Sequence, residues 1–81
     1  MSVVTVQLFA SYAELLGAPQ INISLPSMAR VADVVAAVRL LPGAHALPRN
    51  PRVAVNQQFA EPEAPVSVGD EIALIPPVAG G

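Results

Sequence analysis

The sequence contains no cysteine, no lysine and no tryptophan. The absence of cysteine excludes disulfides, thiolate metal sites and thiol nucleophiles. If this protein handles sulfur, the sulfur therefore cannot sit on one of its own side chains. The absence of lysine excludes isopeptide chains built from copies of this protein joined to one another.

Charged and aromatic residues are also scarce. Only 12% of the residues are charged and 4% are aromatic, and the net charge is −2. The basic residues are Arg30, Arg39, Arg49 and Arg52. Without a basic run, nucleic acid is not an expected partner. No stretch has the pattern of a signal peptide or a membrane span, so we expect a cytoplasmic protein without a membrane partner.

Apolar residues are abundant by contrast. They make up 53% of the 81 residues, which is enough for the core of one domain. Much of this fraction is alanine and valine, so the core should be built from small side chains. A chain so poor in charge is also expected to leave some apolar surface for a partner.

The N-terminal part predicts a strand, a short helix and a second strand. Residues 4–9 alternate in the manner of a strand. Ser11 and Glu14 have the spacing of a capping box, which predicts a helix start at Ser11. Gly17 predicts the end of that helix in a left-handed conformation. Residues 20–25 alternate again and predict the second strand.

Helical spacing marks one main helix. Its apolar stripe consists of Val31, Val34, Val35, Val38 and Leu41. Because valine is a poor helix former, packing on a sheet must stabilise this helix. Asp33 suits the first turn, where the helix dipole favours negative charge, and Pro42-Gly43 predicts the end.

The second half predicts short strands between loops. Residues 43–51 predict a loop and residues 53–55 a short strand, while Phe59 is a candidate for another. Residues 66–70 predict a turn that leads into a final strand at 71–75. Because one apolar helix stripe needs one apolar sheet face, we predict an α+β fold in which a mixed sheet wraps one main helix.

The C-terminal end carries the most specific motif, Pro76-Pro77-Val78-Ala79-Gly80-Gly81. Glycine has no Cβ, so Gly80 and Gly81 place the main-chain carboxylate on a thin stem. Pro76-Pro77 stiffens the base of this stem. Its last four residues reach roughly 13 Å when extended, which suits insertion into another protein's active site. We therefore predict a domain over 1–77 and a flexible tail over 78–81.

These segments resemble the small, sulfur-carrying subunit of molybdopterin synthase, a ubiquitin-like β-grasp family. The resemblance covers nearly the whole chain. Its opening lies in residues 6–17, its middle strand in 53–57 and its end in 68–81. The most specific part is Gly-Asp-Glu, an apolar strand and Pro-Pro-Val-x-Gly-Gly. At Arg30 the family usually has Thr or Ser, so Ser27 is the alternative cap, with a longer first helical turn.

The resemblance implies a function in molybdenum cofactor biosynthesis. A ubiquitin-activating-type partner would adenylate the carboxylate of Gly81 with ATP, and sulfur would then give a thiocarboxylate. The tail would enter the large subunit of molybdopterin synthase, in a heterotetramer of two small and two large subunits, and pass sulfur to cyclic pyranopterin monophosphate. On this reading the chain is no enzyme on its own and binds neither cofactor nor metal.

The resemblance also assigns the partner-binding residues. Phe9, Phe59 and Ile75 match apolar positions at which the family binds its partner proteins. The tail segment 76–79 would enter those partner proteins. Phe9 has the opposite strand parity to Leu8, which favours a surface position. Core packing remains the alternative for all three side chains.

Other functions remain open on the sequence. One is sulfur carriage for thiamine or another pathway. Another is a protein modifier attached through Gly81. His45, alone in a loop, is expected to be solvated, and Asp70 is expected to serve the turn rather than a carboxylate pair with Glu71.

Overall fold

A computed structural model describes residues 2–77 of the chain. The predicted tail, residues 78–81, lies outside the described residues, so the domain boundary after residue 77 stays a prediction. The elements follow in the order β1 (Ser2–Leu8), α1 (Ala10–Leu16), β2 (Gln20–Leu25), α2 (Val31–Arg39), a short 3-10 helix η1 (Ala44–Ala46), β3 (Arg52–Val55), β4 (Gln58–Ala60) and β5 (Ile72–Ile75).

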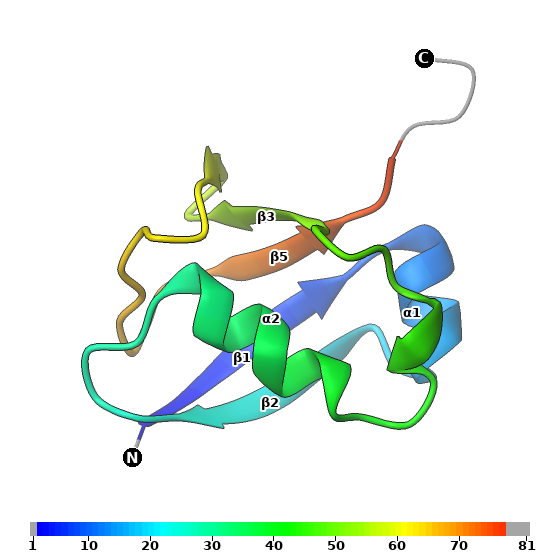
Figure 1. Ribbon diagram of the computed structural model, residues 1–81, viewed down its shortest axis with the longest axis horizontal. Coiled ribbons are helices and arrows are strands. Elements are labelled where there is room, and N and C mark those ends of the chain that lie inside the picture. The colour runs from blue at the N-terminus through cyan, green and yellow to red at the C-terminus, as the bar shows by residue number, and fades with distance from the viewer. Residues whose placement is uncertain (1, 78–81) are drawn as a thin grey trace.

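A five-stranded mixed sheet carries the fold, with the order β2-β1-β5-β3-β4 (Figure 1). β1 is antiparallel to β2 and parallel to β5, while β3 is antiparallel to both β5 and β4. The last strand therefore lies in the middle of the sheet. α2 lies across one face, which confirms the predicted α+β arrangement (Figure 1).

The core lies between α2 and the sheet. Alternate residues of β1 point into it, and the valine stripe of α2 covers them from above. The most deeply buried large side chains are Val6, Val34, Val38, Ile72 and Leu74. Val35 and Leu41 pack at the edge of the core as partly buried side chains.

The start of α1 differs from the prediction. The helix begins at Ala10, its N-cap is Phe9, and no side chain caps it. Ser11 is therefore the second residue of the helix and lies inside its first turn, after Ala10, whose φ of 46° is left-handed. The Ser11–Glu14 capping box is therefore wrong, whereas the left-handed end at Gly17, with φ 74°, is confirmed.

The start of α2 explains how the helix does without a Ser or Thr cap. Arg30 is the N-cap, and its main-chain N–H donates to Asp33 Oδ2 at 2.8 Å. The N–H groups of Val31 and Ala32 donate to carbonyl oxygens of the loop that follows β4, each at 2.9 Å. The alternative cap at Ser27 is wrong because these partners already satisfy the first turn.

Two of the connecting turns contain residues with positive φ. Gly43 has a φ of 88°, and a Cβ there would collide with the main-chain oxygen of Leu15. Between β3 and β4, Asn56 and Gln57 have φ values of 53° and 69°. Positive φ at both positions of a two-residue hairpin loop is what a type I′ turn requires.

We expect Asp33→Ala to lower the free energy of unfolding by about 1 kcal/mol, because the N-cap loses its hydrogen bond and the helix dipole loses a negative charge. Urea unfolding followed by circular dichroism measures this change. Glu14→Ala, on the exposed side of α1, is the control and should stay within about 0.5 kcal/mol of the parent. Equal losses in the two variants would contradict this account of the cap.

We expect Gln57→Gly to stabilise the protein by about 0.5 kcal/mol. A left-handed non-glycine residue costs roughly 1–2 kcal/mol, whereas glycine costs roughly 0.5–1 kcal/mol in lost chain entropy. The control is Gln58→Gly in β4, where only the entropy loss applies and stability should fall. A thermal melt of both variants measures the difference, and a lower melting temperature for Gln57→Gly would contradict the strain argument.

Candidate docking site on the open face of the sheet

The face of the sheet opposite α2 carries a shallow apolar hollow of about 420 Å³. We call it the open-face hollow. Its lining consists of Gln7, Phe9, Ala54, Gln57, Phe59, Glu71, Ala73 and Ile75. Phe9, Phe59 and Ile75, which the sequence singled out, thus come together in one place. The alternative that they fill the core is wrong for the two phenylalanines, whose side chains are 49% and 65% exposed.

Strand register produces the hollow. Ala54 is paired with Phe59 on one side and with Ala73 on the other, and Ala73 is paired with Gln7. Side chains of directly paired residues lie on the same face. Two adjacent alanines therefore make a low floor, with Phe59 rising at one side of it.

Phe9 reaches this face although it lies outside β1. Its backbone is extended, with φ −123° and ψ 150°, so the alternation of the strand continues for one more residue. Leu8 points into the core and Phe9 points away from it. The parity argument from the sequence is therefore confirmed, even though the strand ends at Leu8.

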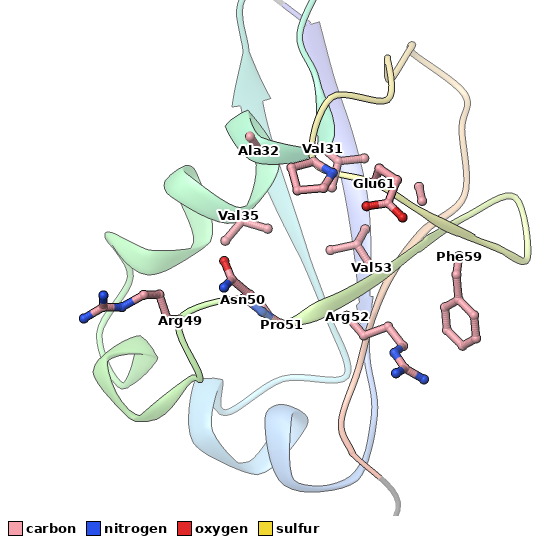
Figure 2. Close-up of a pocket in the computed structure, with 12 residues that line it drawn as sticks. Val31, Ala32, Val35, Arg49, Asn50, Pro51, Arg52, Val53, Phe59 and Glu61 are labelled. Atoms are coloured by element: carbon pink, nitrogen blue, oxygen red, sulfur yellow. The ribbon is translucent and has the colours of Figure 1, made fainter.

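Arg52 is not part of the lining, but it contacts Phe59 at the edge of the hollow. The guanidinium carbon of Arg52 lies 4.9 Å from the centre of the Phe59 ring, which is a cation–π contact. Figure 2 shows the two side chains next to each other, beyond the edge of α2. Arg52 is also the direct partner of Ile75 in the β3–β5 ladder. The sequence analysis missed Arg52, and only the register of β3 against β5 reveals its position.

A second hollow, of about 780 Å³, lies on the opposite face, between α2 and the β3–β4 hairpin (Figure 2). Val31, Val35 and Val53 form part of its wall, and Arg52 and Phe59 also line it. Arg49 borders it, and the Arg49 guanidinium points away from Phe59 (Figure 2). This hollow exists because α2 packs mainly over β2.

The turn before β5 behaves as the sequence predicts. Asp70 accepts hydrogen bonds from the Ser67 main-chain N–H at 2.7 Å and from the Asn56 side-chain amide at 3.1 Å. The Glu71 main-chain N–H donates to Asn56 Oδ1 at 2.9 Å. Asp70 is thus committed to the turn, while the Glu71 side chain lies at the open-face hollow.

The described residues offer little chemistry of their own. Within residues 2–77, no group of three or more His, Cys, Asp or Glu side chains comes together as a metal site. His45 lies exposed in η1. In the same part of the chain, no helix is long and apolar enough to cross a lipid bilayer.

The chain continues from Ile75 at this hollow into Pro76 and Pro77, of which Pro77 is exposed. The remaining predicted site residues are Val78, Ala79, Gly80 and Gly81, and they lie outside the described residues. Their roles, like the docking role of the three apolar side chains, stay predictions.

Solved structures resemble this fold over nearly its whole length. The crystal structure of SAMP1 from Haloferax volcanii is 29% identical, with 99% of this chain and 100% of that chain covered and a TM-score of 0.80. The Amycolatopsis orientalis BexX/CysO complex contains a chain that is 26% identical, with 96% and 99% covered and a TM-score of 0.73.

A protein–protein complex of subunits 1 and 2 of the molybdopterin-converting factor from Helicobacter pylori 26695 also matches. It is 22% identical, with 98% of this chain and 99% of that chain covered and a TM-score of 0.72. The sequence itself matches the ThiS family over residues 6–81. With this match and the shared ubiquitin-like β-grasp fold, the chain belongs to the ThiS family of sulfur carriers.

Proposed function

We propose that this protein carries sulfur for molybdenum cofactor biosynthesis on the main-chain carboxylate of Gly81. One observation carries the proposal. The open-face hollow includes Ile75, the last residue of β5, and the chain runs from there through Pro76-Pro77 toward Gly80-Gly81. A partner that docks on this face thereby receives the tail.

The chemistry takes place at one carbonyl. The carboxylate of Gly81 attacks the α-phosphate of ATP in the adenylating partner, which forms an acyl adenylate and releases pyrophosphate. A sulfide equivalent then displaces AMP to give the thiocarboxylate. In the large synthase subunit, the thiocarboxylate sulfur forms a bond to a carbon of cyclic pyranopterin monophosphate, and water then cleaves the acyl carbon–sulfur bond, which restores the carboxylate of Gly81 and leaves the sulfur on the acceptor. Two such transfers build the dithiolene.

The partners supply the catalytic groups in this scheme. The described residues do not bring a nucleophile together with a base, and they hold no cluster of metal ligands. What they do supply is a rigid apolar surface beside the root of the tail. ATP is therefore a substrate of the adenylating partner, and the carrier is the donor subunit of a synthase.

The complexes of two relatives favour a docking role. The Helicobacter pylori structure contains subunits 1 and 2 of a molybdopterin-converting factor, and the Amycolatopsis orientalis structure pairs CysO with BexX. The same comparisons keep two alternatives in view. SAMP1 is a small archaeal modifier protein, which favours attachment through Gly81 as the second candidate, and CysO favours sulfur carriage for another pathway.

We expect incubation with ATP, the adenylating partner and a sulfur source to add to the C-terminal residue the mass of one oxygen-to-sulfur exchange. Intact-mass and fragment-ion spectra measure it. A variant that lacks Gly81 is the control, and it should remain unmodified with an unchanged melting temperature.

Adding the large synthase subunit and cyclic pyranopterin monophosphate then tests the pathway. Molybdopterin formation with recovery of the carboxylate supports the proposal. Isopeptide conjugates on other proteins, without molybdopterin, would establish the modifier function instead. No mass change at Gly81 would overturn every form of carriage.

We expect Phe59→Ala to weaken binding of both the adenylating partner and the large subunit by at least about 1 kcal/mol, because exposed aromatic anchors dominate interfaces. Isothermal titration calorimetry with each partner measures the loss, and the two partners should compete. Val68→Ala is the matched control, since Val68 is 66% exposed and Phe59 65%, but Val68 lies outside the open-face hollow. Equal effects of the two substitutions would contradict a docking role for this hollow.

A further inference from the structure

The charged residues of the open face are separated along β5. At the end of the strand from which the tail leaves, Arg52 is paired with Ile75 and stacks on Phe59. At the other end, Glu71 precedes Ile72 and lines the hollow beside Ala73. Positions 71 and 75 are separated by about 13 Å along an extended strand.

The side chains of Arg52 and Glu71 are both exposed to solvent. Within residues 2–77, no carboxylate forms an ion pair with Arg52. Glu61 follows β4 and lines the second hollow together with Arg52, and Figure 2 shows its carboxylate apart from the Arg52 guanidinium. The main chain of Glu71 is hydrogen-bonded to Asn56, and the Glu71 side chain is exposed.

The neighbouring groups strengthen this polarity. Asp70, held by Ser67 and Asn56, adds a second negative charge at the Glu71 end. The stack on Phe59 holds the guanidinium of Arg52 over the wall of the hollow. The Debye length in physiological salt is about 8 Å, so a docking surface experiences the two ends as separate charges.

We propose that the open face is electrostatically polarised and selects a protein partner with an acidic group facing Arg52 beside the tail, an apolar side chain in the hollow and a basic group facing Glu71. This proposal rests on the proposed function, because it describes the partner that receives the tail. The hollow supplies the apolar contact, and the two charges fix the direction in which the partner lies along β5. Only one of the two directions brings its active site to the tail.

Charge reversals test the polarity separately from the net charge. The variant Arg52→Glu changes the net charge from −2 to −4, and Glu71→Lys changes it from −2 to 0. The double variant restores −2 but inverts the polarity. Arg49→Glu is the matched control, since it also gives −4. Both arginines line the second hollow, but the Arg49 guanidinium points away from Phe59, whereas that of Arg52 lies beside it (Figure 2).

The probe is the purified adenylating enzyme of the source cells, with affinity measured by calorimetry and turnover by pyrophosphate exchange at low and high salt. We expect each single reversal to weaken binding about tenfold and the double variant to bind more weakly than either. Arg49→Glu should change affinity less than about twofold. Arg52→Lys, which keeps the charge, should retain most of the affinity, and high salt should weaken the parent but improve the double variant.

The experiment distinguishes failure of the polarity proposal from failure of the proposed function. If the parent binds and supports exchange but the double variant performs equally well, net charge alone matters and the polarity proposal is overturned while the proposed function stands. If Arg49→Glu weakens binding as much as Arg52→Glu, the polarity proposal is likewise overturned. If the parent itself neither binds nor supports exchange, the proposed function fails, and the polarity proposal fails with it.

Discussion

The pairing of β5 between β1 and β3 is the contact on which the rest of the structure depends. Ile72 and Leu74 are fully buried, and their strand lies between the β1–β2 pair and the β3–β4 hairpin in the sheet. Because β5 is central, Ile72, Ala73 and Leu74 are paired with β1 on one side and with β3 on the other, and Ile75 is paired with Arg52 of β3. The residues that follow Ile75 therefore leave from a strand in the middle of the sheet, at the edge of an apolar surface.

The limited reach of α2 decides where the second hollow lies. A helix of nine residues is about 13.5 Å long, so it covers only part of a five-stranded sheet. It packs mainly over β2, and its first turn is held by the loop between β4 and β5. The helix therefore leaves the second hollow between itself and the β3–β4 hairpin on the same face. The open-face hollow has a separate origin, because on the opposite face Ala54 and Ala73 form a low floor beside Phe59.

The sequence predicted the strands, the main helix and the apolar positions of the site because these depend on local periodicity. Val31, Val34 and Val38 alternate with exposed residues at helical spacing, and Phe9 continues the parity of β1. The sequence could not predict contacts between segments that lie far apart along the chain. The Ser11–Glu14 spacing matched a capping box, but α1 begins at Ala10, so Ser11 lies inside the helix. The cap of α2 stayed open between Arg30 and Ser27, because the carbonyl partners of the first turn come from a loop about thirty residues further along the chain. Arg52 was overlooked for the same reason, since its importance follows from pairing with Ile75 rather than from its neighbours in sequence.

The central position of the last strand also makes the fold sensitive to whether the chain is whole. Val6 is paired with Ile72, so the sheet closes only when segments from opposite ends of the sequence meet. Contacts between such distant segments form late and slowly. A polypeptide interrupted before residue 72, during synthesis or by a protease, lacks the strand that joins both halves of the sheet. Such a fragment lacks Ala73 and Ile75, so the open-face hollow is incomplete. The open-face hollow therefore forms only after the last strand of the chain is in place.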